Sequence, residues 1–151
     1  MSPAVFLDAN VPIYAAGGDH PLKEPCAQIL RTVAEDPRPF VTDSEVLQEL
    51  LHRYLALSRW ELGREVLRAF AEAMQGRIEP VHSEDILDAS KLADRHPTVS
   101  ARDLVHAAVM QRVGADRIIS ADTDFDQLEG IDRLDPTSVS QMETPSKEKQ
   151  Q

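Results

Sequence analysis

The chain has 151 residues, of which 42% are hydrophobic and 28% are charged. This length and composition are typical of a single globular domain and exclude a disordered or fibrous protein. The 26 acidic and 16 basic side chains give a formal net charge of −10, which argues against a protein that coats nucleic acid nonspecifically.

Hydrophobic periodicity and turn residues predict short strands that alternate with helices. The predicted strands cover residues 5–7, 40–42, 77–81 and 117–120, and the predicted helices begin near residue 10 and cover 25–35, 43–57, 59–74, 83–94 and 100–113. Ser83 and Ser100 are the expected N-caps of the last two helices, and Gly114 the left-handed stop of the last. The alternation predicts an α/β fold in three layers, with helices flanking a mainly parallel sheet of four to five strands.

We expect one domain over residues 1–135 and a polar, disordered tail over residues 136–151, because the tail has almost nothing to bury. The single cysteine, Cys26, cannot form an intramolecular disulfide. No run approaches the ~18 apolar residues of a membrane span. Asp8 interrupts the first apolar stretch too early for a signal peptide, so a cytoplasmic protein without membrane contact is expected.

Two carboxylates are expected to converge at one edge of the sheet. Asp8 comes directly after the first predicted strand, and Asp122 comes just after the last. In open parallel sheets, ligands gather outside the carboxyl ends of the strands, where the strand order reverses. Asp103, in the first turn of a predicted helix, and Glu49, on the helix after the second strand, are candidates to join them.

Both helical acids also have a purely structural interpretation. Asp103 and Ser100 match a capping box, although the rest of that helix is apolar nearly all round, so a carboxylate there needs a partner or a cation. Glu49 could form a surface pair with Arg53, four residues further along the helix.

An acidic segment follows the last predicted strand. It contains Asp116, Asp122, Asp124, Asp126, Glu129, Asp132 and Asp135. Such a run is either a solvated loop or a cation site, and the solvated loop is the commoner case. The histidines at positions 52, 82 and 106 do not form a zinc-ligand spacing with a cysteine pair, so they are interpreted as surface or satisfied interior residues and no zinc is assigned.

Carboxylates brought together cannot all remain ionised without a positive partner, since like charges raise one another's pKa. Oxygen ligands without histidine or thiolate favour Mg²⁺ or Mn²⁺. A cation of this kind can activate a water for in-line attack on phosphorus, which indicates phosphodiester hydrolysis.

Four segments of the chain resemble those of PIN-domain ribonucleases, specifically the VapC-type toxins of bacterial toxin–antitoxin pairs. They are residues 6–14, 41–54, 101–108 and 118–125. No single motif is specific, whereas all four in this order and spacing are a strong signal. The resemblance implies an acidic quartet of Asp8, Glu49, Asp103 and Asp122 around one or two Mg²⁺ or Mn²⁺ ions.

The same resemblance implies accessory residues and partners. Asp124 would be an accessory acid, and Asn10 and Ser120 would orient the quartet through hydrogen bonds. The family cleaves single-stranded or loop RNA, typically forms homodimers, and is inhibited by a small antitoxin protein. Ala9, where many relatives have Ser or Thr, and Ser120, where Thr is commoner, depart from the pattern without removing a carboxylate.

Because the net charge is negative, RNA must be held by local cations. The candidates, which are equally suited to dimer contacts or to solvent, are Arg53, Arg59, Arg64, Arg68 and Arg102.

Two rival functions stay open. A phosphatase of the haloacid dehalogenase type also begins with an Asp after its first strand, but it normally has a second Asp two positions on, where this chain has Asn10. A non-catalytic interaction module would keep the fold without turnover.

Overall fold

The computed structural model describes residues 2–139 and contains one parallel five-stranded sheet. The elements are, in order, β1 (Val5–Leu7), α1 (Asn10–Ala16), α2 (Lys23–Glu35), β2 (Phe40–Asp43), α3 (Ser44–Ala56), α4 (Trp60–Ala73), β3 (Ile78–Glu79), α5 (Ser83–Arg95), α6 (Ala101–Val113), β4 (Arg117–Ile119), the 3₁₀ helix η1 (Thr123–Gln127) and β5 (Asp132–Leu134). The predicted α/β fold with flanking helices is confirmed. No helix in this part of the chain is long and apolar enough to cross a membrane.

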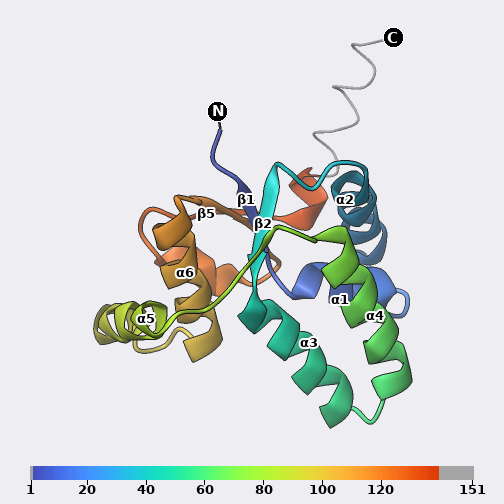
Figure 1. The fold of residues 1–151 in the computed structure, drawn as a ribbon, viewed down its shortest axis with the longest axis horizontal. Helices are drawn as coiled ribbons and strands as arrows, with labels where there is room; N and C mark the ends of the chain where they lie inside the picture. The colour runs from blue at the N-terminus through green and yellow to red at the C-terminus, as the bar shows by residue number, and fades with distance from the viewer. Residues whose placement is uncertain (1, 140–151) are drawn as a thin grey trace.

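The strand order places β1, which leads to Asp8, beside β4, which leads to Asp122. The order is β3-β2-β1-β4-β5, so the chain builds outward from β1 in one direction and then returns to its other side with β4. Figure 1 shows α5 and α6 on one side of the strands and α1, α2 and α4 on the other. The carboxyl ends of β1 and β4 are therefore neighbours at the point where the strand order reverses, which is where open α/β sheets bind ligands.

The core lies on both faces of β1 and β4. Phe6, Ile118 and Phe125 are completely buried. The α6 helix is buried along residues 103–110, as its apolar composition predicts. Burial on both faces explains why these strands appear in the sequence as short continuous apolar runs.

Some element boundaries differ from the prediction. The α5 helix is capped by His82 instead of Ser83, because the His82 N–H donates to Asp85 Oδ2 at 2.8 Å in a capping box. The β3 strand is shorter than predicted and ends before Pro80, which has no N–H to donate to a ladder.

The folded region extends beyond the predicted boundary at residue 135. Residues 136–139 are helical and Pro136 is buried. Val139 packs against the core, and its N–H donates to the Asp135 carbonyl at 3.2 Å. The start of the predicted tail is thus part of the domain, and its remainder, 140–151, lies outside the described residues.

Gly63 allows α3 and α4 to pack closely. A Cβ added at Gly63 would lie 2.3 Å from the Cβ of Tyr54. Since both positions are buried, we expect Gly63→Ala to lower the free energy of unfolding by about 1–3 kcal/mol through overpacking. Urea denaturation measures this change, with Gly18→Ala as the control because a Cβ there meets nothing within 4 Å. A Gly63→Ala protein as stable as the control would contradict the close packing.

Candidate functional site

Asp8 lies at the carboxyl end of β1 and is held by three polar neighbours. Its side chain is buried, and Oδ1 accepts the Ala9 N–H at 2.8 Å. Oδ2 accepts the Ser120 hydroxyl at 2.6 Å and the Asn10 amide at 3.3 Å. The Asn10 amide also lies 3.1 Å from Ser120 Oγ. Asn10 and Ser120 thus orient the Asp8 carboxylate, in the geometry that the resemblance implies.

A second acidic group forms where α6 begins and β4 ends. One carboxylate oxygen each of Asp103, Asp122 and Asp124 lies within 4.8 Å of the others. Ser100 Oγ caps α6 by accepting the Asp103 N–H at 3.3 Å, while the Asp103 side chain turns toward the cluster. The capping interpretation therefore accounts for the backbone of Asp103 and leaves its carboxylate for the site.

Glu49 turns inward from α3 and does not form the surface pair with Arg53 that was the alternative. Its side chain is buried, and Oε1 accepts a hydrogen bond from His106 Nε2 at 2.9 Å. The guanidinium of Arg102 lies at the edge of this group, with Nε 3.8 Å from Glu49 Oε1.

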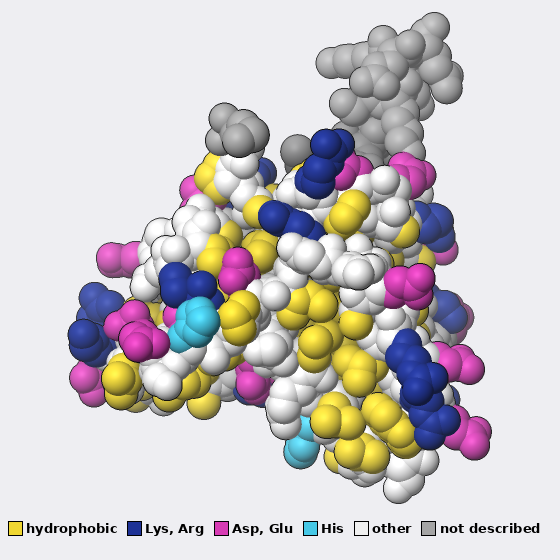
Figure 2. Space-filling model, viewed as in Figure 1, with side chains coloured by type: hydrophobic (Ala, Val, Ile, Leu, Met, Phe, Trp, Pro, Cys, Tyr) yellow, Lys and Arg dark blue, Asp and Glu magenta, His cyan; other side chains and the backbone are white. Residues whose placement is uncertain are grey.

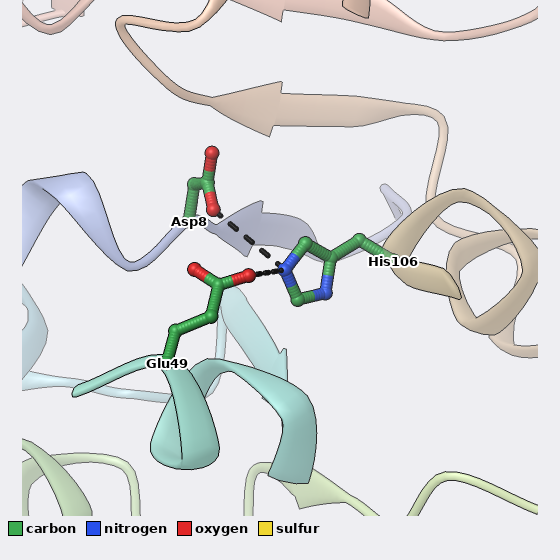
Figure 3. A group of neighbouring side chains, drawn as sticks. All are labelled: Asp8, Glu49 and His106. Carbon is green, nitrogen blue, oxygen red and sulfur yellow. Dashed lines mark hydrogen bonds and ion pairs between the residues drawn. The ribbon is translucent and has the colours of Figure 1, made fainter. Parts of the chain in front are cut away.

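His106 and Asp43 also lie at this site, although neither was predicted to belong to it. Both are completely buried, and His106 Nδ1 lies 2.8 Å from Asp43 Oδ2. Figure 3 shows His106 pointing from α6 toward Asp8 and Glu49, and its Nε2 is 3.8 Å from Asp8 Oδ1. Two signals could have found them: His106 follows Asp103 by three residues and so shares its helix face, and Asp43 ends a parallel strand.

The group that contains Asp8 and Glu49 and the group that contains Asp103, Asp122 and Asp124 interact electrostatically. Burial, a hydrogen bond to Asp122 and repulsion from Asp8 raise the pKa of Asp103 to about 8. Burial also raises the pKa of Asp8, with a contribution from Glu49, against the opposing effects of His106 and Ser120. The four acids of the predicted quartet therefore lie in two groups, Asp8 with Glu49 and Asp103 with Asp122, and repulsion between Asp8 and Asp103 links the two.

His106 is the positive group inside this cluster. Burial opposes its charge, but the hydrogen bonds to Asp43 and Glu49, together with the negative charges of Asp43 and Asp8, hold the pKa of His106 well above its usual value. One imidazolium does not balance the surrounding carboxylates. A site made of oxygen donors with this excess of negative charge suits a hard divalent cation, so the residues present fit Mg²⁺ or Mn²⁺.

The other predicted contact residues are spread over the surface. The five arginines at positions 53, 59, 64, 68 and 102 are exposed. Arg102 is the one whose ion pair reaches the acidic cluster within residues 2–139, whereas Arg64 lies 6.0 Å from the ring of Trp60.

The acidic segment after β4 is divided. Asp122 and Asp124 face the site, while Asp126 pairs with Arg133 at 3.0 Å and Asp132 is exposed. The segment is therefore solvated in one part, whereas Asp122 and Asp124 lie beside Asp103 in a group of carboxylates.

Comparisons with known proteins agree with this geometry. The family model described as "PIN domain" matches residues 5–131. Ribonuclease VapC13 of Mycobacterium tuberculosis is 36% identical over 133 residues, which cover 86% of this chain and 98% of that protein. The crystal structure of VapBC2 from Rickettsia felis, bound to a DNA fragment from their promoter, superposes with a TM-score of 0.66 at 17% identity, covering 87% of this chain and 97% of that one.

The VapC20 toxin of Mycobacterium tuberculosis, described as cleaving the sarcin–ricin loop, superposes with a TM-score of 0.63 at 22% identity and covers 82% of this chain and 94% of its own. These two structures share the fold. The family match spans most of the chain, and the identity to VapC13 extends over nearly that whole protein. The chain therefore belongs to the PIN-domain family.

Proposed function

We propose that this protein is a metal-dependent endoribonuclease and the toxin of a type II toxin–antitoxin pair. The observation that supports the proposal is the pair of acidic groups, Asp8 with Glu49 and Asp103 with Asp122 and Asp124, between which Asp8 and Asp103 repel each other. The ribonuclease VapC13, to which the chain is 36% identical, supports RNA as the substrate class. Membership of the PIN family removes the support for a haloacid dehalogenase phosphatase.

The four carboxylates would hold one or two Mg²⁺ or Mn²⁺ ions, with Asp124 as an accessory acid. A bound divalent cation lowers the pKa of a water for in-line attack and offsets charge on the leaving oxygen. The Ser120 hydroxyl, which donates to Asp8 Oδ2, favours the ionised form of Asp8 against the effect of burial on its pKa. Because the pKa of Asp103 is about 8, this group would give up its proton when a cation binds.

Partner proteins are proposed on two grounds. VapBC2, which has the same fold, was crystallised on promoter DNA, and this supports an antitoxin partner for the present chain. Leu51, Leu55 and Leu57 are exposed on the α3–α4 hairpin, and Figure 2 shows hydrophobic side chains gathered at this lower end of the molecule. Such a patch is suited to a second copy of the chain, so a homodimer is proposed.

A cytoplasmic location is proposed as well, because the free, buried Cys26 suits a reducing compartment.

Incubation of the purified protein with end-labelled structured RNA tests the function. Cleavage is expected with Mn²⁺ or Mg²⁺ and not with excess EDTA, and an RNA hairpin carrying the sarcin–ricin sequence is one substrate to include. Binding of RNA without cleavage at any metal concentration would support the non-catalytic module instead.

Arg102 is the arginine best placed to hold the phosphate backbone near the scissile bond. Its side chain is 55% exposed and reaches the rim of the acidic cluster at Glu49. We expect Arg102→Ala to raise the KM for RNA several-fold and to reduce the salt dependence of binding by about one phosphate contact. Arg38→Ala, which removes an exposed arginine paired with Asp36, is the control. Equal KM values for the two variants would contradict this role.

A further inference from the structure

The His106 ring lies between two carboxylates that it joins. Nδ1 is 2.8 Å from Asp43 Oδ2, and Nε2 is 2.9 Å from Glu49 Oε1. Each ring nitrogen therefore lies within hydrogen-bond distance of a different carboxylate, one from the end of β2 and one from α3. Two hydrogen bonds inside a fully buried space fix the plane and the position of this ring.

Asp43 is itself fixed through both oxygens. Its Oδ1 accepts the Val46 N–H at 3.0 Å as the N-cap of α3, and its Oδ2 accepts from His106. Asp43 therefore ties the ring to the start of the same helix that carries Glu49. The resulting bridge runs from the α3 N-terminus through α6 and back to α3.

The bridge determines which oxygen of Glu49 is available. Oε1 is taken by His106, whereas Oε2 accepts no hydrogen bond from any residue within the described part of the chain. Figure 3 shows the second oxygen of Glu49 on the side of the carboxylate away from the ring. A flexible glutamate would otherwise sample many rotamers, so this contact pre-organises one ligand oxygen.

We propose that His106 and Asp43 are positioning residues that orient Glu49 for the divalent cation. This inference rests on the proposed function for its kinetic consequence, but it makes a separate claim about cation binding. His106 acts through Glu49 and does not itself contact the cation. Outer-sphere partners of this kind typically change metal affinity or activity by about 10–100-fold when they are removed.

The test compares His106→Gln and Asp43→Asn with the wild type. Asparagine keeps an N-cap acceptor for α3, so Asp43→Asn changes the partner of His106 without removing the cap. His52→Gln is the matched control, since His52 is exposed on α3. Calorimetric titration with Mn²⁺ alone gives the affinity, and steady-state cleavage of labelled RNA gives kcat and KM separately.

We expect His106→Gln to weaken Mn²⁺ binding and to lower kcat by about 10–100-fold each, with KM for RNA within about twofold of the wild type. Asp43→Asn should shift both quantities in the same direction by less, and His52→Gln should shift neither. Thermal melting checks that each variant is folded, and if His106→Gln does not fold, Asp43→Asn carries the test.

Two outcomes would overturn the proposal. One is a folded His106→Gln protein whose Mn²⁺ affinity and kcat equal those of the wild type. The other is a directly coordinated nitrogen in the electron spin-echo spectrum of Mn²⁺-bound wild type that disappears in His106→Gln, since His106 would then be a ligand. Wild-type protein that binds Mn²⁺ but cleaves no RNA would refute the proposed function alone, because the affinity comparison would still stand.

Discussion

Asp8→Asn is expected to reduce metal-dependent RNA cleavage by at least about a hundredfold, a loss larger than outer-sphere substitutions cause. Asp8 is buried at the strand-order reversal and interacts with both Glu49 and Asp103. Asparagine has nearly the same shape and keeps an oxygen for Ser120 or Ala9, so the fold should survive. Single-turnover cleavage of labelled RNA at saturating Mn²⁺ measures the loss.

The control for Asp8→Asn is Asp132→Asn, which removes one negative charge from an exposed position of the acidic segment. It should cleave RNA at the wild-type rate, because the solvated acids of this segment lie outside the cluster. An Asp8→Asn protein that retained more than a tenth of the wild-type rate would show that the chemistry does not depend on this carboxylate.

Asp103→Asn is expected to stabilise the metal-free protein at pH 8. Folding raises the pKa of Asp103 from 3.8 to about 8, chiefly by burial, so the folded protein binds this proton more tightly than the unfolded chain does. The stability from that proton is fully present below pH 3.8 and is lost as the pH rises through about 8. Asparagine resembles the protonated acid, because its amide can donate to Asp122 at every pH.

The effect should be large enough to measure by thermal melting in EDTA. A difference of one in pKa is worth about 1.4 kcal/mol, and 1 kcal/mol moves the Tm of a domain of this size by about 2–4 °C. We therefore expect Asp103→Asn to exceed the wild-type Tm by at least about 3 °C at pH 8 and to match it near pH 4. The groups that face Asp103 are Asp8, Asp122, Asp124 and His106.

Asp88→Asn, an exposed substitution on α5, is the control and should show no such dependence on pH. Mn²⁺ should narrow the difference at pH 8, because a ligand at a hundred times its Kd stabilises the folded state by about 2.7 kcal/mol and the wild type binds it more tightly. A Tm difference between Asp103→Asn and wild type that was constant from pH 4 to 8 would contradict the assigned pKa.

The strand ends could be predicted from the sequence because the rule that governs them is local. A buried parallel strand is a continuous apolar run, and the polar residue after it lies at the carboxyl edge. This rule predicted that the ends of the strands before Asp8 and Asp122 meet at one edge, and the hydrogen bond from Ser120 to Asp8, between residues 112 positions apart, joins these two strand ends. The edge strand β5 was not located, since two of its three residues are charged and it pairs with β4 on one side.

The bridge through His106 could not be predicted because it depends on how two helices meet. His106 and Asp43 are 63 positions apart, and neither periodicity nor capping preference specifies that α6 places a ring beside the start of α3. Glu49 shows the same limit, since its place on the helix after the second strand allowed either Arg53 or the interior as its partner. Only the packing of α3 against α6 decides between them.

The central claim is that the acids from β1, α3, α6 and the β4 end share one cation site. Anomalous diffraction from crystals soaked in Mn²⁺ tests it most directly. We predict a peak within coordination distance of Asp8 together with at least two of Glu49, Asp103 and Asp122, and no such peak in Asp8→Asn crystals. Mn²⁺ bound only elsewhere, with these four carboxylates bridged by protons and water alone, would contradict the claim.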